Sequence, residues 1–362
     1  MLYNLLYPLH VQFSFLNIFR YITFRAIMAA VTAFSLSLIF GPWVIKKLKS
    51  WNIGEKVIKK DSTQLDELHR SKQSTPTMGG IFILIAMIGS TLLWSDMSNF
   101  YIHLALFGTL WLGATGFADD YLKQKKPNAK GLTAMTKLVS QAILGIACGA
   151  IIYLYFPEHT RLDIPFLKNV ALELGACYVF LALLVITGTS NAVNLTDGLD
   201  GLAIGCVIMA SLAFAVLSYV TGNIKISEYL LIPYLRGSGE LTVFCASIFG
   251  AGLGFLWFNC YPATIFMGDV GSLALGGALG IVALLIKKEL LLVIVGGVFV
   301  IEALSVILQI ISFRVFKKRI FKIAPLHHHF QFLGWPESKV IVRFWIVAIL
   351  LALVTVMTLK LR

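Results

Sequence analysis

The sequence predicts an all-α, polytopic integral membrane protein with about ten transmembrane helices and both termini on the outer, periplasmic side of the membrane. Its composition is the first reason. Of the 362 residues, 58% are hydrophobic and only 13% are charged, and the mean hydropathy is +0.84. Soluble domains have about 45–50% apolar and about 25% charged residues. A soluble globule of this length could not bury so much apolar surface, so lipid must cover it.

The apolar residues form runs close to the ~20 residues that a helix needs to cross a bilayer. Glycines cluster in the seventh and eighth runs, where they predict close packing between helices. The ten runs are residues 21–43, 79–95, 100–118, 137–156, 172–190, 201–220, 239–258, 271–286, 290–312 and 340–359.

The distribution of Lys and Arg predicts the orientation. The loops 44–78, 119–136, 191–200, 259–270 and 313–339, with flanking Lys137 and Arg343, contain 20 of the 30 basic residues. The opposite side contains the other 10. Because basic residues accumulate on the cytoplasmic side, these loops are expected to be cytoplasmic.

Composition also excludes several classes of protein. A disordered chain, a collagen-like fibre and a secreted disulfide scaffold do not fit so apolar a sequence. The net charge of +12 comes from basic loops between apolar runs, so it does not indicate nucleic-acid binding. The first charged residue is Arg20, so residues 1–19 are expected to form an interfacial segment rather than a signal peptide. Five cysteines without metal-type spacing are expected to be buried apolar side chains: Cys148, Cys177, Cys206, Cys245 and Cys260.

Several of the 18 acidic residues stand in groups at the predicted cytoplasmic ends of spans. Each group alone is explained by a helix cap or a solvated boundary charge. An acid at mid-membrane costs about 2.5–3.5 kcal/mol, so the membrane–water boundary is the expected depth. Three groups from three loops on one face predict a shared site there. They are Asp119 and Asp120, Asp197 and Asp200, and Asp269.

Carboxylate oxygens suit Mg²⁺, which takes one or two protein carboxylates and completes its shell with water and substrate phosphate. Neighbouring helical side chains point about 100° apart, so Asp119 and Asp120 are not expected to chelate one ion together. Asp197 and Asp200, three residues apart, would share one face of a helix. Mg²⁺ is the expected cofactor.

Loops rich in Gly, Thr and Ser enter the second, sixth and eighth spans: Thr75–Gly80, Asn194–Gly201 and Gly268–Ser272. These spans point their helix N-termini at the cytoplasmic face, where free N–H groups and a partial positive charge bind phosphate. Glycine also allows the backbone to approach a ligand closely. With the acids, these loops predict a site for metal-bound phosphate.

A triple histidine, His327–His329, lies in the last predicted cytoplasmic loop. No second cluster offers the spaced ligands that zinc needs, so phosphate binding or substrate positioning is favoured over a zinc site or a solvated loop. Most basic residues fit the topology rule and contact with anionic lipid. Four lysines near the predicted site are candidates for phosphate contact: Lys72, Lys123, Lys130 and Lys137.

Five sequence motifs of this chain resemble those of the polyprenyl-phosphate N-acetylhexosamine-1-phosphate transferases. The triple histidine and the similarity across nearly the whole chain point to the members that use UDP-N-acetylmuramoyl-pentapeptide. Small departures at Ala118 and Ser190 remove no charged or metal-binding group. Five stretches occur in order and on one predicted face: Thr75–Gly80, Phe117–Tyr121, Asn191–Ala203, Phe266–Ser272 and His327–His329.

The resemblance implies a Mg-dependent phosphoglycosyl transferase of peptidoglycan synthesis. Residues 1–362 would form one transmembrane catalytic domain in the bacterial inner membrane, with its active site facing the cytoplasm. Undecaprenyl phosphate would attack the β-phosphate of UDP-N-acetylmuramoyl-pentapeptide, UMP would leave, and lipid I would form. The partners implied are these two substrates and membrane lipid, without nucleic acid, and a homodimer remains an open option.

The resemblance also implies residue roles. Asp269 would be a Mg²⁺ ligand, and Asp119 and Asp120, candidates for further ligands, would arrange the metal and the lipid phosphate. The other catalytic candidates, His327, His328 and His329, would contact the diphosphate or the sugar. The Phe266 ring would stack on uracil. The nucleotide would be lined by Lys72, Thr77, Asn194, Asp197, Asp200, Asn259 and Phe266.

Two mechanisms and two rival functions remain open. The lipid phosphate attacks directly, or an aspartate first forms a covalent phosphosugar enzyme. A phosphate ester with a second pKa near ~6 is largely ionised at pH 7, which favours direct attack. The nearest rival is a sister transferase that uses UDP-N-acetylglucosamine, which a comparison of the two donors would separate. A secondary transporter would instead have acids near mid-membrane, accessible from both faces.

Overall fold

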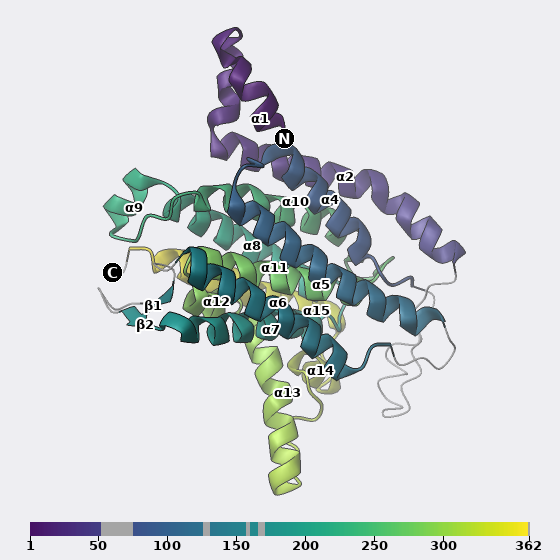
Figure 1. Ribbon diagram of the computed structural model, residues 1–362. Coiled ribbons are helices and arrows are strands. Elements are labelled where there is room, and N and C mark those ends of the chain that lie inside the picture. The colour runs from purple at the N-terminus through teal and green to yellow at the C-terminus, as the bar shows by residue number, and fades with distance from the viewer. Residues whose placement is uncertain (52–74, 126–130, 157–159, 166–170, 361–362) are drawn as a thin grey trace.

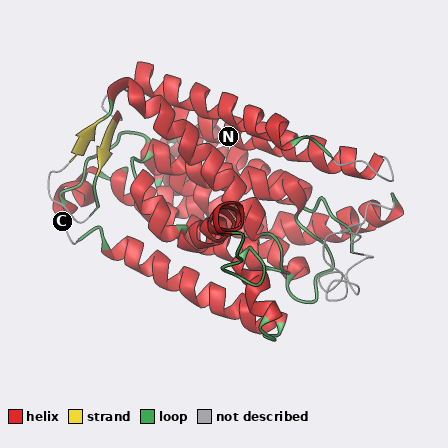
Figure 2. Ribbon diagram, turned by 90° about the horizontal axis from the view of Figure 1, so that it is seen from below, coloured by secondary structure: helices red, strands yellow, loops and turns green. Residues whose placement is uncertain are grey.

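The computed structural model describes residues 1–51, 75–125, 131–156, 160–165 and 171–360, and these residues form a helical bundle with one two-stranded hairpin (Figures 1 and 2). In this described part, nine helices are long and apolar enough to cross a membrane. Gly80–Trp94 is also apolar but has only 15 residues. Each of the ten predicted apolar runs is largely helical, so the predicted all-α membrane architecture is confirmed.

The long helices have the following bounds: α2 Ile22–Ser50, α4 Gly80–Trp94, α5 Phe100–Lys125, α6 Ala134–Tyr155, α7 Tyr178–Thr196, α8 Leu202–Thr221, α10 Leu241–Asn259, α11 Gly268–Leu285, α13 Gly297–Phe316 and α15 Glu337–Met357. The short helices are α1 Leu2–Leu6, η1 Tyr7–Val11, η2 Ser14–Arg20, η5 Gly175–Cys177, α9 Ile224–Leu230, η6 Ser238–Glu240, α12 Glu289–Val295 and α14 Leu326–Phe332. The strands β1 (Arg161–Asp163) and β2 (Ala171–Glu173) pair antiparallel.

Helix α11 forms the centre of the bundle and is surrounded by α4, α5, α7 and α8. In the most apolar 18-residue stretch of α11, 89% is buried, against 22% in the corresponding stretch of α15 at the periphery. Its small residues explain this position, because an added Cβ at Gly277 would overlap Leu112 of α5, and Gly276 lies against the backbone of Thr189 in α7. The close packing predicted from these glycines is confirmed.

The predicted span 290–312 is broken into two helices, α12 and α13, at Gly296. Helix α13 leaves the bundle at a steep angle in Figure 1 and is seen nearly end-on in Figure 2. The part of this segment that is long and apolar enough to cross a membrane is α13, which begins at Gly297 rather than at residue 290. Two consecutive glycines, Gly296 and Gly297, lower helix propensity here although the run is long and apolar.

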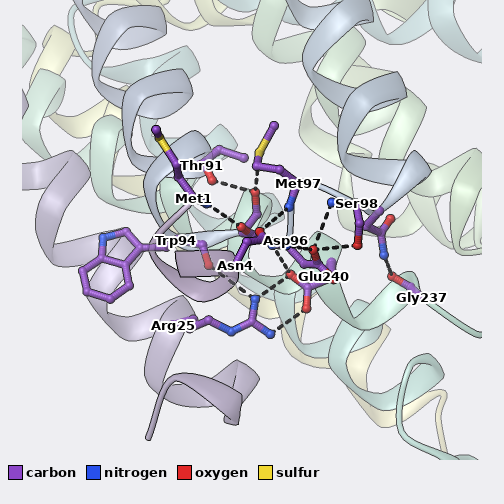
Figure 3. A network of polar contacts seen from close by, with 12 residues as sticks. Met1, Asn4, Arg25, Thr91, Trp94, Asp96, Met97, Ser98, Gly237 and Glu240 are labelled. Atoms are coloured by element: carbon purple, nitrogen blue, oxygen red, sulfur yellow. Dashed lines mark hydrogen bonds and ion pairs between the residues drawn. The ribbon is translucent and has the colours of Figure 1, made fainter. Parts of the chain in front are cut away.

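One end of the bundle is fixed by the N-terminal polar network, defined as Asn4, Arg25, Asp96 and Glu240 (Figure 3). The guanidinium of Arg25 donates to both carboxylate oxygens of Glu240, at 2.7 and 2.6 Å, and the backbone N–H of Asp96 donates to the same carboxylate at 2.9 Å. Asn4 donates to the Asp96 carboxylate at 2.9 Å. The network thus joins α1, α2, the loop after α4, and η6.

The hairpin β1–β2 lies between α6 and α7, and Asp163 of β1 lies 3.6 Å from the ammonium of Lys288. Cys177 stands between this hairpin and α7, and Cys260 directly follows α10. Both are exposed, whereas Cys148, Cys206 and Cys245 are buried. The expected burial of all five cysteines was wrong for these two, because they stand outside the long helices rather than within them.

Candidate active site

Asp119 and Asp120 lie in the last two turns of α5, and both are buried. Gly116, one turn earlier, faces the backbone of Asp269 at the start of α11, and a Cβ at Gly116 would overlap that backbone. Glycine at this position therefore lets the two helices meet without a side chain between them. The contact places the third carboxylate beside the first two.

Asp269 occupies the first turn of α11, and the residue before it, Gly268, has φ +73°. This left-handed conformation suits glycine and turns the chain sharply into the helix. The N–H of Val270, in the same first turn, donates to Asp120 at 3.2 Å. One N-terminal backbone donor of α11 is therefore aimed at the acids.

The three acids form the carboxylate cluster, defined as Asp119, Asp120 and Asp269. One oxygen from each lies within 4.8 Å of the others. The predicted convergence of these acids is thus observed, and the spacing of their oxygens would allow Asp119 and Asp120 to bind the same ion, although they are neighbours on one helix. Asp269 reaches both because α11 is packed so close to α5 at Gly116.

Two predicted lysines, Lys123 and Lys137, lie among these carboxylates. The ammonium of Lys137 is 2.8 Å from Asp119 and 2.5 Å from Asp269. The ammonium of Lys123 is 2.5 Å from Asp119 and 3.4 Å from Asp269. Three carboxylates thus share two ammonium groups, which leaves one formal negative charge in excess.

The cluster has the chemistry of a site for a hard cation. Its donors are carboxylate oxygens, the ligands that Mg²⁺ prefers, and they come from two rigid helices rather than from mobile loops. The ammonium groups of Lys123 and Lys137 already lie where positive charge is needed. The acidic cluster can therefore bind a metal ion.

The start of α6 closes one side of the cluster. Thr133 caps this helix by accepting the N–H of Thr136 at 3.1 Å, and Lys137 follows one turn later. The N–H of Leu132 donates to Asp119 at 2.7 Å. Because this second oxygen of Asp119 is fixed by the backbone, the carboxylate has one defined orientation.

Three nucleotide-side candidates come from neighbouring segments: Asn194 from the end of α7, Phe266 from the loop before α11 and Thr77 from the segment before α4. Asn194 near the end of α7 accepts a hydrogen bond from Ser272 of α11 at 3.1 Å, which ties it to the helix of Asp269. Phe266 pairs with the segment before α4, where its N–H donates to Pro76 and its carbonyl accepts from Gly79, both at 2.8 Å. The hydroxyl of Thr77 lies close to Gly268. These candidates therefore surround the start of α11.

Two other candidates hold these loops together. Asn259 accepts from the N–H of Gly201 at 3.0 Å and donates to the carbonyl of Ile265 at 2.8 Å. Asp200 accepts from the N–H of Ala263 at 3.0 Å. The side chains of Asn259 and Asp200 are both buried, and these hydrogen bonds hold the loops together. Asp197, which directly follows α7, is half-buried. Lys72 and Lys130 lie outside the described residues.

The triple histidine begins α14, and its three rings differ in surroundings. His327 is fully buried, and its ring packs against Gly198. The half-buried His328 has its Nδ1 2.9 Å from the Gln331 side chain, and His329 accepts the N–H of Lys322 at 3.1 Å.

Sequence reasoning missed two acids that support the site. Glu302, on α13, is fully buried and binds His327. Glu337, at the start of α15, accepts the N–H of Asp200 at 3.1 Å. A signal for Glu302 was present, because an acid within an apolar run is expected to have a partner. Its partner could not be read from the sequence, since it lies 25 residues away.

Comparison with known proteins gives a consistent picture. Residues 102–287 match glycosyl transferase family 4. Three relatives, each similar over 100% of both chains, carry the name phospho-N-acetylmuramoyl-pentapeptide-transferase. They come from Desulforapulum autotrophicum (53% identical), Citrifermentans bemidjiense (52%) and Syntrophus aciditrophicus (50%).

Proposed function

The chain belongs to glycosyl transferase family 4 and, within it, to the phospho-N-acetylmuramoyl-pentapeptide-transferases, and we propose that the carboxylate cluster is its active site. It transfers phospho-N-acetylmuramoyl-pentapeptide from a nucleotide sugar to a lipid carrier, which forms lipid I in peptidoglycan synthesis. One observation carries the assignment of the site. Three carboxylates and two lysines from α5, α6 and α11 converge where the nucleotide-side loops meet.

We propose that Asp119, Asp120 and Asp269 hold Mg²⁺, which fits their oxygen donors and spacing. When bound, the ion would neutralise charge on the diphosphate of the donor. Lys123 and Lys137 would then be released from some of their carboxylate contacts and could bind phosphate oxygens. Positioning and charge neutralisation supply most of the catalysis in phosphoryl transfer, so no strong base is required.

The donor in this proposal is UDP-N-acetylmuramoyl-pentapeptide, bound along Thr77, Asn194, Asp197 and Phe266. An oxygen of undecaprenyl phosphate attacks the β-phosphorus, the bond from that phosphorus to the oxygen of UMP breaks, and UMP leaves with the electron pair. Direct attack predicts that radiolabelled UMP does not exchange into the donor without lipid acceptor. Exchange under those conditions would instead indicate a covalent phosphosugar enzyme.

An apolar groove runs along α7, the helix that ends at the nucleotide-side candidates. It has a volume of about 290 Å³ and lies between α7 and the α11–α13 segment. Ala192 and Val193 line it and directly precede Asn194, so the groove is continuous along α7 with the nucleotide side. We propose that it holds part of the polyprenyl chain.

Turnover by purified protein tests the reaction. With undecaprenyl phosphate and Mg²⁺, we expect UMP release from UDP-N-acetylmuramoyl-pentapeptide, little release from UDP-N-acetylglucosamine, and loss of both on chelation of the metal. A strong preference for the N-acetylglucosamine donor would assign the chain to the sister reaction. Full activity after chelation would contradict the metal assignment.

We also propose that residues 1–362 act as one catalytic domain whose active site faces the cytoplasm, because the loops at this end are the basic ones. The two exposed cysteines test the orientation, since Cys260 lies at the end of α10 nearest the site and Cys177 at the distant end of α7. A membrane-impermeant maleimide should label Cys260 only from the cytoplasmic side and Cys177 only from the outside. Cys260→Ser and Cys177→Ser are the matched controls, and the reverse pattern would contradict the orientation. The homodimer that the sequence leaves open is not supported.

A further inference from the structure

Glu302 and His327 form a buried pair outside the carboxylate cluster. Glu302 lies on α13 and His327 at the start of α14, and both are 0% exposed. One carboxylate oxygen accepts the backbone N–H of His327 at 3.1 Å, and the other lies 3.1 Å from the ring Nδ1. Both carboxylate oxygens of Glu302 therefore contact His327.

The pair fixes the orientation of the imidazole ring. With Glu302 as an ionised carboxylate, which only accepts hydrogen bonds, Nδ1 is the ring nitrogen that donates to it. The other ring nitrogen, Nε2, is buried and has no hydrogen-bond partner among the described residues. Its edge packs on Gly198, where an added Cβ would overlap Nε2 and lie 3.0 Å from Cε1. Only glycine leaves room for the ring.

Gly198 lies at the centre of the turn between α7 and α8, with Asp197 on one side and Asp200 on the other. Asp200 fastens this turn to Ala263 through its side chain and to Glu337 through its N–H. The contact of His327 with Gly198 supports the turn at a third point. The shape of the turn therefore depends on a ring that Glu302 holds in place.

We propose that Glu302 is a positioning residue that acts through His327 to hold the Asp197–Gly201 turn in the shape that binds the sugar nucleotide. This inference rests on the proposed function in placing the nucleotide beside Asp197. It gives His327 a structural contact with the turn in place of a contact with the reacting phosphate. Loss of the support should weaken donor binding and leave acceptor binding unchanged.

Replacement of Glu302 tests the predicted direction of the kinetic effect. Glu302→Ala removes both acceptors of His327 and should raise KM for the donor by about 10-fold, with KM for undecaprenyl phosphate unchanged. Glu302→Gln retains an oxygen for the backbone N–H of His327, so it should recover part of the loss. A fall in kcat with an unchanged donor KM would overturn the proposal, because His327 would then act on the reacting groups.

A double-mutant cycle tests the contact itself. Gly198→Ala alone should raise the donor KM by about 10-fold, because Cβ and the ring cannot share the space. In a His327→Ala background, where the ring is absent, the same substitution should cost less than about 2-fold. Additive effects of the two substitutions would overturn the proposal.

Two further measurements keep the result interpretable. If His327→Ala does not yield a folded, monodisperse protein, the cycle is run between Gly198→Ala and Glu302→Ala, which removes the carboxylate that holds the ring against Gly198. Calorimetric binding of UDP reports the same coupling without turnover. If the two substitutions have coupled effects on UDP binding but the protein does not transfer the muramoyl donor, the proposed function alone is refuted. If transfer is normal but the effects of the two substitutions are additive, this inference alone is refuted.

Discussion

The N-terminal polar network and the carboxylate cluster both bury charge, but they balance it differently. In the network, Arg25 meets Glu240 through two parallel hydrogen bonds, and the side chains are 2% and 11% exposed. The planar guanidinium matches one carboxylate, so the pair is neutral and rigid. In the cluster, three carboxylates share Lys123 and Lys137, and the Lys123 side chain is 39% exposed.

This difference separates the Arg25–Glu240 pair from the proposed binding site. A matched Arg–Glu pair has no remaining charge for a ligand, and its two partners join helices that are distant in sequence. The cluster has a formal excess of one negative charge, and the Lys123 side chain that contacts it is 39% exposed. Buried charge alone therefore does not mark a functional site, and the proposed site differs from the Arg25–Glu240 pair in gathering three carboxylates around shared ammonium groups.

The largest expected effect is on the cluster. Asp269→Asn removes a carboxylate but keeps its size, so transfer should fall by at least about 10³-fold, the equivalent of roughly 4 kcal/mol of lost stabilisation. The melting temperature should change little, because the excess charge decreases. UMP release measured across Mg²⁺ concentrations checks this. An active variant with unaltered Mg²⁺ dependence would contradict the assignment of Asp269 as a Mg²⁺ ligand.

The second effect concerns the network and should appear in stability rather than activity. Arg25→Met leaves Glu240 buried without its partner, which should destabilise the fold by about 3–5 kcal/mol. The double variant Arg25→Met/Glu240→Leu should recover most of this loss, because neither charge is then buried alone. Thermal unfolding in detergent measures both. In both variants, KM for the donor should stay within about 2-fold of the value for the unmodified protein. A larger change would show that the network also affects donor binding.

The third effect concerns the apolar groove. Gly188 lines it, and a Cβ added there meets nothing within 4 Å, so a large side chain can enter without disturbing the fold. Gly188→Phe should raise KM for undecaprenyl phosphate by about 10-fold, which corresponds to roughly 1.4 kcal/mol, with donor KM unchanged. A polyprenyl phosphate too short to reach the groove serves as the matched control. An equal loss with both acceptors would place the chain elsewhere.

The sequence predicts most of the architecture because apolar length and charge distribution are local properties. The apolar runs predict the helices, and the three acidic groups predict residues that do gather near the start of α11. Tertiary contacts are not local. The pairing of Glu302 with His327 and the loop contacts of Asn259 depend on neighbours that no periodicity identifies. Convergence of Asp119 and Asp120 likewise required the close approach of α11.

The smallest expected effect is the pH dependence of Asp96 in the network. Burial acts to raise the pKa of this carboxyl, but hydrogen bonds from Ser98 and Asn4 outweigh it, and the pKa lies below its ordinary value. A lowered pKa contributes stability that is present above the unfolded value near ~4 and is lost as the pH falls through the folded value. On acidification below about pH 4, the melting temperature of Asp96→Asn should therefore fall less than that of the unmodified protein, by under about 2 °C because the group is partly solvated. Comparison of the two proteins at each pH cancels the contribution of the other acids, and identical pH profiles would show that Asp96 contributes nothing to the network.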